Sequence, residues 1–455
     1  MVRLLRVGAS VRAAFRATLA ALVAFGFAGR TTPDRFDPGR IVILVVVDTL
    51  RADHVGIHGL ARRDATPNLD RFARRGAWFL NAHSAAPWTP PSVQSLLTSL
   101  DPAVHGLNRE GSAYAESIPR LSGRARPLAQ LLAESGFRTN AITGGGGVDS
   151  RYGFDRGFES WFQPESVTGI DVESGVDKAL AWLGRLAPGE RAFLLLHTYE
   201  VHLPNTHHLF ATEETGDDRS RASAAYDGDV AFADRELGRF FRELERTSLL
   251  PRSLVVVTAD HGENLFDRVL GGRGVEHGHH LHDELTHVPL ILVAPGLVPA
   301  RGPIPGLVSL LDVMPTILSL VGVAPPGYPM QGRDLRPALQ LLQPLDSGRA
   351  LFAGAPLQGP LWRSVRTGTA KYVLSPPVAG AQWWNSVVRP PEAVYDLGKD
   401  PEERWNVAAT SAVARDRLKA LLRNREREEA RLRDQMGPVG ASPGISTLRS
   451  LGYLR

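Results

Sequence analysis

Residues 41–50 read IVILVVVDTL, and the apolar run from Ile41 to Val47 is unbroken until Asp48. A strand that is buried on both faces carries such a continuous run, whereas a strand with one wet face alternates apolar and polar residues. The run therefore predicts a buried strand inside a parallel sheet. Asp48 then lies at the carboxyl end of that strand.

Similar runs recur along the chain, at Ala192–His197, Leu254–Thr258 and Val288–Val293. The segments between them have helical periodicity, as in Leu128–Glu134 and Val230–Leu244. Strands that alternate with helices predict an α/β fold with a large, mostly parallel sheet flanked by helices. Because ligands bind outside the carboxyl ends of such strands, we expect the polar residues at these ends to converge.

The C-terminal part has a different pattern. Short segments punctuated by Trp and Pro follow residue 345, and an Arg- and Glu-rich helix is expected from Ala412 to about Gln435. We interpret residues 346–455 as a small α+β subdomain of short antiparallel strands with a terminal helix. Residues 41–345 form the main domain, residues 30–40 a linker, and residues 1–29 a separate leader segment.

Composition excludes several classes of protein. The chain has 455 residues, 43% of them hydrophobic and 22% charged, which argues against wholesale disorder and against a polytopic membrane protein. The net charge is +4, and the arginines are spread along the chain, so no nucleic-acid surface is expected. The absence of cysteine excludes a disulfide framework, a thiolate zinc site and a cysteine nucleophile.

The first 29 residues have the pattern of an export signal. Four arginines precede an apolar run from Ala17 to Gly29, and Gly26 and Ala28 are small enough for a cleavage site. This run is short for a membrane span. The pattern predicts a periplasmic or extracellular protein, with an uncleaved N-terminal membrane anchor as the alternative.

Asp48, Asp260 and His261 follow buried runs, the last two within TADHGEN. Carboxylate and imidazole groups at neighbouring strand ends can bind one cation. Thr89 begins the segment TPPSVQSLL, which predicts a helix to about Leu100. A hydroxyl at a helix start is commonly a cap, but free N–H groups and the helix dipole there also favour an alkoxide and an anionic substrate.

Histidines are concentrated in two further segments. The segment EHGHHLHDELTH predicts metal or substrate contacts, with a solvated polar loop as the alternative, and contains His277, His279, His280, His282 and His287. The segment LLLHTYEVHLPN places three more polar candidates at a strand end: His197, Glu200 and His202.

The order of these blocks resembles the sulfatase family of the alkaline-phosphatase superfamily. The blocks that carry the resemblance span about residues 40–410 and include DTLRADHVG, TADHGEN, HGHHLHDELTHVPLILVAPG and VYDLGKDPEERWN. Several ordered blocks are more specific than any single motif. The resemblance implies an alkaline-phosphatase-like sandwich, with residues 41–345 as the catalytic domain.

The resemblance also implies roles for particular residues. The implied metal ligands are Asp48, Thr89, Asp260 and His261. Thr89 would be the nucleophile, and His279, or its neighbour His277, would be the acid that faces the ester. His202 and His277 would contact the substrate.

Three departures from the family pattern bear on function. Formylglycine formation needs Cys or Ser followed by x-Pro-x-Arg, whereas this chain has Thr89 followed by Pro-Pro-Ser-Val. Thr49 stands where the family has a second Asp, and Gly144–Gly147 stand in place of a Gly-Lys-Trp-His block. We therefore expect no formylglycine. With one carboxylate fewer, Zn²⁺ or Mn²⁺ suits the site better than Ca²⁺.

Threonine at the nucleophile position is similar to the phosphodiesterase, phosphonate-hydrolase and phosphoethanolamine-transferase branches of the superfamily. The resulting hypothesis is a metal-dependent hydrolase of sulfuric or phosphoric esters, with a covalent threonyl intermediate. A phosphodiester or phosphonate ester is favoured over sulfate, and the ester is carried by a glycan or lipid. The alternatives are a membrane-anchored head-group transferase and a non-catalytic glycan-binding descendant.

Other polar residues are interpreted as structural. Arg51 and Asp53 are expected to form a local ion pair, and Asp312 and Asp396 to brace turns. His105 is expected at the end of the helix that begins at Thr89. Glu200 and His202 are the only candidates for a second metal site.

Overall fold

The computed structural model describes most of the chain after residue 39. The described residues are 40–59, 64–107, 117–164, 171–210, 216–270, 273–357, 361–375, 391–437 and 440–443. The predicted leader and almost all of the linker lie outside these ranges. In the described ranges, no helix combines the length and apolar character needed to cross a membrane.

A nine-stranded sheet, counted over the described residues, is the centre of the molecule. Its strands, in spatial order, are β10 (His287–Val288), β2 (Ala77–His83), β11 (Leu290–Val293), β7 (Ser253–Thr258), β1 (Ile41–Val47), β6 (Ala192–Thr198), β4 (Arg138–Ile142) and β5 (Ser160–Phe162), and β12 (Gly302–Ser309) pairs with β2. Every residue of β1 is fully buried, and β1 runs parallel to both β6 and β7. The predicted buried central strand is confirmed.

The run Val288–Val293 differs from the expectation of one parallel strand. It is divided at Pro289, which has no backbone N–H to donate, into β10 and β11. β11 runs antiparallel to β7, so that Leu290, at its amino end, pairs with Thr258. The histidine-rich segment before β11 therefore reaches the edge of the sheet at which β1 and β7 end.

β2 was not expected from the sequence and is also part of this arrangement. It runs antiparallel to β11, with Ile291 opposite Trp78. Its carboxyl end at His83 therefore lies at the same edge as the ends of β1 and β7. The segment that leads to Thr89 begins there.

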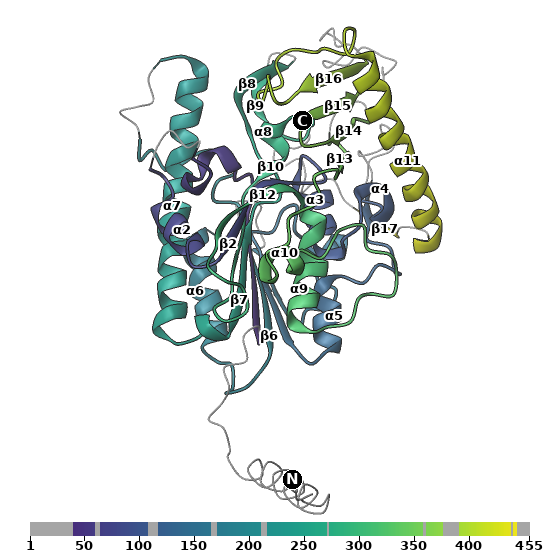
Figure 1. Ribbon diagram of the computed structural model, residues 1–455. Helices are drawn as coiled ribbons and strands as arrows, with labels where there is room; N and C mark the ends of the chain where they lie inside the picture. The colour runs from purple at the N-terminus through teal and green to yellow at the C-terminus, as the bar shows by residue number, and fades with distance from the viewer. Residues whose placement is uncertain are drawn as a thin grey trace, which may run out of the picture. The chain divides into compact units, whose positions relative to one another are not determined.

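Helices cover both faces of the sheet (Figure 1). α2 (Pro67–Ala73), α6 (Val172–Leu183) and α7 (Asp218–Arg246) pack together on one face. On the other face lie α3 (Thr89–Thr98), α5 (Leu128–Glu134) and α9 (Val313–Val321). The bounds expected for the helix at 128–134 are those observed, and the segment 230–244 is part of the longer α7.

α3 is shorter than expected. It ends at Thr98 because Ser99 adopts a left-handed conformation, with φ 57°. α4 (Pro102–His105) is a separate short helix, since the residue before a proline disfavours helical geometry. His105 therefore does not end the helix that begins at Thr89. It braces that helix instead, with Nε2 3.1 Å from Ser95 Oγ.

The C-terminal part contains the expected small antiparallel sheet and helix. The sheet consists of β13 (Leu351–Ala353), β14 (Arg363–Arg366), β15 (Ala370–Leu374) and β16 (Glu392–Asp396). α11 (Ala412–Met436) packs on β14 and β15 and buries Leu418 and Leu422. Residues Pro38–Arg455 form one compact unit, so the division at residue 345 stays a prediction.

The remaining elements are short. The helices and strands are α8 (Asp283–Thr286), α10 (Arg336–Gln340), β3 (Ser117–Arg120), β8 (Asn264–Leu270), β9 (Arg273–Glu276) and β17 (Gly440–Pro443). The 3₁₀ turns are Ala52–His54, Gly56–His58, Ser150–Tyr152, Leu250–Arg252 and Leu310–Asp312. β8 pairs with β9, and β3 pairs with β17.

Candidate active site

Four strands bring polar residues to one edge of the central sheet. Asp48 follows β1 directly. Asp260 and His261 follow β7, and one residue separates the end of that strand from Asp260. His197 is the second-last residue of β6. Thr89 comes after β2 in the chain and begins α3. These side chains are buried: His197 is 2% exposed and the other four are 0% exposed.

Thr89 lies among the predicted metal ligands. Its Oγ1 donates a hydrogen bond to Asp48 Oδ2 at 3.0 Å and lies 3.2 Å from His261 Nε2. The same Nε2 is 3.5 Å from Asp260 Oδ2 and 3.7 Å from Asp48 Oδ1. The hydroxyl, the imidazole and both carboxylates therefore surround one small volume.

A hydrogen bond from its Nδ1 atom fixes the ring orientation of His261. Its Nδ1 lies 2.8 Å from the carbonyl oxygen of Gly262, which can only accept a hydrogen bond. Nδ1 therefore carries the hydrogen, and the lone pair of Nε2 faces the carboxylates and Thr89. A metal-binding histidine is typically held by such a hydrogen bond from its other ring nitrogen.

The two carboxylates have the surroundings of a cation site. Among the described residues, Asp48 Oδ1 and Asp260 Oδ2 are buried without a hydrogen-bond partner. Burial, together with the neighbouring Asp260 carboxylate, raises the pKa of Asp48 to about 7. A divalent cation would satisfy both orphaned oxygens and remove the repulsion between the acids. The donor set of two carboxylates, one imidazole and one hydroxyl fits Zn²⁺ or Mn²⁺.

Thr49, at the position of the missing second Asp, adds no carboxylate. It adopts a left-handed backbone with φ 61°, which costs a β-branched residue about 1–2 kcal/mol. This geometry aims its N–H at Asp260 Oδ1, 3.3 Å away, and Tyr226 donates a hydrogen bond to its carbonyl oxygen at 2.7 Å. The strained turn thus orients the carboxylate of Asp260.

The start of α3 offers fewer N–H groups than the sequence analysis expected. Pro90 and Pro91 have no backbone N–H, and the N–H of Ser92 donates to the carbonyl oxygen of Trp88 at 3.3 Å. The helix dipole still favours negative charge at Thr89. Hydrogen bonds to a bound anion must nevertheless come largely from other parts of the site.

The four-glycine segment after β4 approaches the nucleophile closely. A Cβ on Gly147 would lie 3.0 Å from Thr89 Cβ and also 3.0 Å from the hydroxyl oxygen of Tyr199. The Gly147 N–H donates to that oxygen at 2.7 Å. Tyr199 was not among the predicted site residues, although it lies in the segment LLLHTYEVHLPN, two residues after His197.

Of the histidines in the segment EHGHHLHDELTH, His277 contacts His261, with ring centroids 4.6 Å apart. Its Nδ1 lies 2.9 Å from Glu263 Oε2. Burial raises the pKa of Glu263 to about 7 and lowers the pKa of His277 to about 4. Glu263 was also missed, and its signal is its place in TADHGEN, two residues after His261.

His279 contacts the histidines on both sides of it in the sequence. Its Nδ1 is 3.1 Å from the carbonyl oxygen of His277, and its ring packs edge-on against His280 at 4.8 Å. Of the two histidines expected to face the ester, His277 is the one in contact with a ligand of the candidate metal site.

His202 is half-buried on the other side of His277, at 5.0 Å between ring centroids. Its Nδ1 lies 2.7 Å from the carbonyl oxygen of Leu203. Glu200 turns elsewhere, accepting the Val172 N–H at 2.8 Å and lying 2.8 Å from His207 Nε2. The described contacts therefore do not combine Glu200 and His202 into a second metal site.

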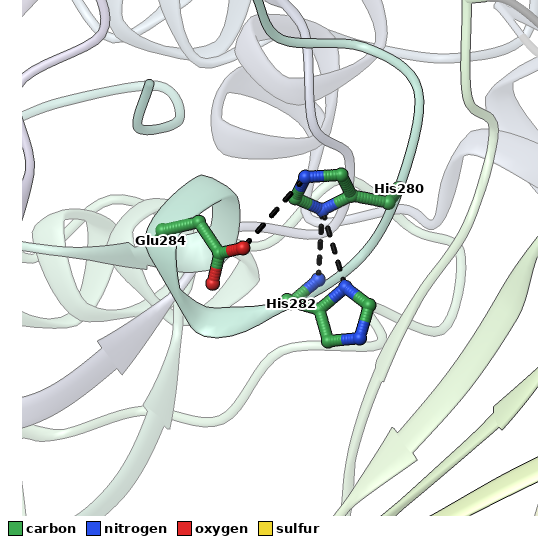
Figure 2. A group of neighbouring side chains, drawn as sticks. All are labelled: His280, His282 and Glu284. Carbon is green, nitrogen blue, oxygen red and sulfur yellow. Dashed lines mark hydrogen bonds and ion pairs between the residues drawn. The ribbon is translucent and has the colours of Figure 1, made fainter. Parts of the chain in front are cut away.

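His280, His282 and Glu284 form a separate group (Figure 2). The Nδ1 atoms of His280 and His282 are 3.3 Å apart, and His280 Nε2 is 3.7 Å from Glu284 Oε1. The ligand atoms of this group are as close together as those of Asp48, Asp260 and His261. Tyr395, from β16, lies with its hydroxyl 3.1 Å from His282 Nε2.

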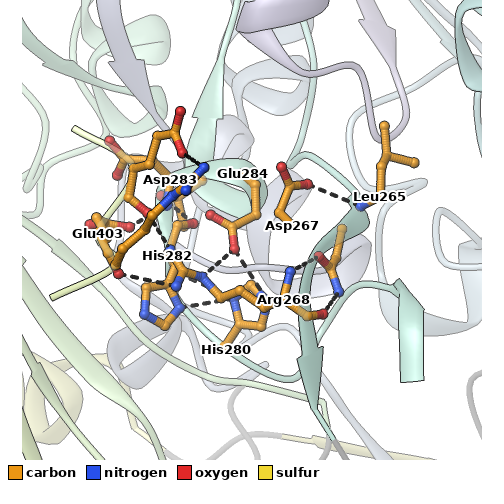
Figure 3. A network of polar contacts seen from close by, with 12 residues as sticks. Leu265, Asp267, Arg268, His280, His282, Asp283, Glu284 and Glu403 are labelled. Carbon is orange, nitrogen blue, oxygen red and sulfur yellow. Dashed lines mark hydrogen bonds and ion pairs between the residues drawn. The ribbon is translucent and has the colours of Figure 1, made fainter. Parts of the chain in front are cut away.

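The carboxylates around this second group are paired with cations (Figure 3). Arg268 donates to Glu284 at 2.6 Å, and Lys371 lies 2.9 Å from both Asp283 and Glu403. The network joins β8 and α8 to the C-terminal sheet. His287 belongs to neither group, because its Nε2 lies 2.9 Å from the carbonyl oxygen of Leu80.

A C-terminal segment supports both sides of the candidate site. Trp88, directly before Thr89, donates its indole N–H to the carbonyl oxygen of Ala355 at 2.7 Å. The Leu357 N–H donates to the carbonyl oxygen of Gly278 at 2.7 Å, between His277 and His279. One short segment therefore fixes the nucleophile loop relative to the histidine loop.

Three structural interpretations from the sequence are confirmed. Arg51 and Asp53 form an ion pair at 2.7 Å. Asp312 forms a capping box with Ser309 and a buried ion pair with Arg349 at 2.6 Å. Asp396 accepts the Gly398 N–H at 3.2 Å and so braces a turn. Trp383 and Trp384, which the sequence assigns equally to packing or to glycan stacking, lie outside the described residues.

Comparison with known proteins places this site in a known context. The sequence model of the Sulfatase family matches residues 40–323, more than half of the chain. An arylsulfatase of Clostridium perfringens is 22% identical over 335 residues, which cover 56% of this chain and 68% of that enzyme.

Two solved structures have the same fold. The phosphonate monoester hydrolase of Agrobacterium radiobacter has a TM-score of 0.63 at 18% identity, over 87% of this chain and 96% of that one. A protein solved in complex with its substrate, D-glucosamine-2-N,6-O-disulfate, has a TM-score of 0.66 at 17% identity, over 86% and 98% of the two chains.

Proposed function

The chain belongs to the sulfatase family and is an ester hydrolase, and we propose that it cleaves phosphate diesters or phosphonate monoesters, with Thr89 as the nucleophile. The observation that carries the proposal is the place of Thr89 Oγ1, 3.0 Å from Asp48 Oδ2 and 3.2 Å from His261 Nε2. A hydroxyl among two carboxylates and an imidazole is one that a bound cation can activate.

Asp48, Asp260, His261 and Thr89 would hold the metal, which supplies Lewis acidity that lowers the pKa of the hydroxyl and offsets negative charge on the ester. Thr89 Oγ1 gives its proton to Asp48 Oδ2, 3.0 Å away, and attacks the phosphorus in line. The ester P–O bond opposite breaks, and the leaving oxygen departs with the bonding electron pair and takes up a proton from solvent. A covalent threonyl ester remains. Water then attacks that ester, and the Thr89 oxygen is released with its proton restored.

His277 is placed to assist the second step. Since Glu263 can hold the Nδ1 hydrogen of His277, Nε2 is the nitrogen suited to take the proton from the attacking water. His202 lies beside His277 and is half-buried, so it suits contact with the group that the ester carries. Two successive displacements at phosphorus give net retention of configuration.

One observation supports phosphorus over sulfur as the reacting centre, and the fold is compatible with it. The segment at Thr89 lacks both the residue that is converted to formylglycine and the arginine of that motif. The fold is shared with a phosphonate monoester hydrolase. Among the described residues, the site has two carboxylates and one imidazole rather than an all-oxygen cage, which argues against Ca²⁺.

A sulfate ester on a glycan is the second candidate. It is favoured by the similarity to an arylsulfatase and to a protein crystallised with a disulfated glucosamine. In this case Thr89 would attack sulfur without formylglycine. The same nucleophile and ligands would serve, so the substrate alone separates the two candidates.

The experiment is a matched aryl panel of sulfate, phosphate monoester, phosphate diester and phosphonate monoester. Zinc- or manganese-loaded wild type is compared with Thr89→Ala and Thr89→Ser. We expect the diester or phosphonate to turn over fastest, Thr89→Ala to lose at least about 10⁴-fold in kcat, and Thr89→Ser to keep part of it. Preferential sulfate turnover would support the second candidate. No turnover of any substrate by metal-loaded protein would contradict both and favour a transferase or a glycan-binding protein.

A further inference from the structure

We propose that Tyr199 is a substrate contact whose phenolic hydroxyl donates a hydrogen bond to a non-bridging oxygen of the ester held at Thr89. The inference rests on the proposed function and deepens it, because it names a group that stabilises the bound anion. Tyr199 follows β6 directly, and it is partly exposed at the edge of the sheet where the site lies.

The position of the hydroxyl follows from Gly147. A Cβ atom on Gly147 would lie 3.0 Å from Thr89 Cβ and 3.0 Å from the Tyr199 hydroxyl oxygen. The phenol oxygen and the nucleophile therefore both border the space beside the Gly147 Cα. A side chain at residue 147 would fill the space between them.

The hydroxyl has a hydrogen to give. The Gly147 N–H donates to the Tyr199 oxygen at 2.7 Å, so this contact occupies a lone pair and leaves the O–H hydrogen. Among the described residues, no acceptor for that hydrogen is found. The pKa of an ordinary tyrosine is about 10, so the hydroxyl keeps its hydrogen at neutral pH.

The site needs such a donor. The prolines at positions 90 and 91 remove two of the N–H groups that a helix start would direct at an anion. Arg51, which follows Asp48 by three residues, is already bound by Asp53 and by Asp267 at 2.5 Å. A neutral hydroxyl therefore takes a place that a backbone N–H or a cation could have filled.

The ring is held firmly enough to aim the hydroxyl. It packs edge-on against His197 at 4.8 Å and against His202 at 5.5 Å between centroids. Gly144 lies under the ring, since a Cβ there would be 2.4 Å from Tyr199 Cδ2. The glycines of this segment are thus the counterpart of the tyrosine, because larger residues would displace it.

A neutral donor has a consequence for the substrate. A lysine or arginine would favour the second negative charge of a phosphate monoester, whereas a phenol stabilises one charged oxygen without balancing a full charge. We expect the site to prefer monoanionic esters, which include phosphate diesters, phosphonate monoesters and sulfate monoesters. Tyr199 thus selects for charge rather than between phosphorus and sulfur.

The test is Tyr199→Phe, which removes only the hydroxyl, with Tyr152→Phe as the matched control. Tyr152 is buried in a 3₁₀ turn, and among the described residues its hydroxyl has no hydrogen-bond partner. For metal-loaded protein and two aryl diesters with different leaving groups, we expect Tyr199→Phe to lower kcat/KM about tenfold to hundredfold. The loss should be the same for both leaving groups, because the contact is to a non-bridging oxygen. Tyr152→Phe should retain full activity.

A loss below twofold, or a loss that grows with the pKa of the leaving group, would overturn the proposal. Binding of orthovanadate to metal-loaded protein, measured by calorimetry, separates this failure from failure of the proposed function. If no substrate turns over, vanadate should still bind about tenfold more weakly to Tyr199→Phe than to wild type. Equal vanadate affinity would overturn the role of Tyr199 whatever the reaction is.

Discussion

This molecule contains two compact groups of histidine and carboxylate side chains. The two groups differ in their surroundings. One consists of Asp48, Asp260 and His261, and the other of His280, His282 and Glu284. In both groups the ligand atoms lie within 4.8 Å of one another. Residue type and spacing alone would therefore assign a metal ion to each.

The difference is in what faces the carboxylates. In the described residues, Asp48 Oδ1 and Asp260 Oδ2 have no hydrogen-bond partner. Glu284, in contrast, accepts a hydrogen bond from Arg268 at 2.6 Å. Lys371 and Arg366 likewise pair with Asp283. Since buried charge must be balanced, the first group favours a bound cation, whereas cationic side chains already face the second group. We therefore propose the first as the metal site and the second as a structural joint.

The strongest test removes one carboxylate from the first group. Asp260→Asn should weaken metal binding by more than about 100-fold and reduce turnover to near background. Metal analysis of purified protein is expected to give about one ion per chain for wild type and close to none for the variant.

His282→Gln is the control for this comparison, because it removes a histidine from the second group. It should keep the metal content of wild type. Two ions per chain in wild type, with one lost in His282→Gln, would show that the second group binds metal too.

The next effect is a pH dependence of the metal-free protein. Burial and Asp260 raise the pKa of Asp48 from 3.8 to about 7, so the folded state holds a proton that the unfolded chain releases. The stabilisation is therefore complete below about pH 4 and is lost as the pH rises to about 7. It amounts to at most about 4 kcal/mol in the free energy of unfolding.

Thermal unfolding of chelated protein at several pH values measures this effect. Between pH 5 and pH 8 wild type should lose more stability than Asp48→Asn, which cannot ionise. Added Zn²⁺ or Mn²⁺ should raise the melting temperature more at pH 8 than at pH 5. A parallel decline of the two proteins would show that Asp48 keeps an ordinary pKa.

Substitutions in the second group should change the stability of the protein and leave the metal site unchanged. Arg268→Met leaves Glu284 buried without its partner and is expected to cost about 3 kcal/mol in the free energy of unfolding. Urea denaturation measures the cost, and the double variant Arg268→Met, Glu284→Gln should recover part of it. Metal content should not change in either variant, and a loss of metal would contradict the assignment of this group as a joint.

The smallest effect is expected for Tyr395→Phe. It removes the hydroxyl 3.1 Å from His282 Nε2 and should cost about 1 kcal/mol. The folded variant should have the kcat of wild type. A fall in kcat comparable to that of Tyr199→Phe would mean that the joint acts on the active site.

The sequence predicted those parts of the site that follow buried strands. Asp48, Asp260 and His261 stand directly after apolar runs, so their convergence at one sheet edge follows from strand polarity. Thr89 was recognisable from the helix start after it. The direction of β11 was not predictable, because an apolar run reads the same whether its neighbours are parallel or antiparallel.

Glu263 and Tyr199 could not be assigned from the sequence. Glu263 acts through His277, 14 residues away along the chain, and Tyr199 through Gly147, 52 residues away. Contacts of this kind depend on how the loops fold over the sheet edge. Local propensities carry no information about them.

The amino-acid sequence was enough to predict the buried central strands, the sheet edge at which polar residues gather, and the kinds of group available there, because apolar runs and the residues that follow them are local features. The assignment of each histidine to its contacts came from the folded structure. His277 reaches His261, His282 meets Tyr395, and His287 packs against β2. The physical reason is charge and hydrogen-bond balance in a buried environment, which is a property of the neighbours brought in by folding and not of the residue itself.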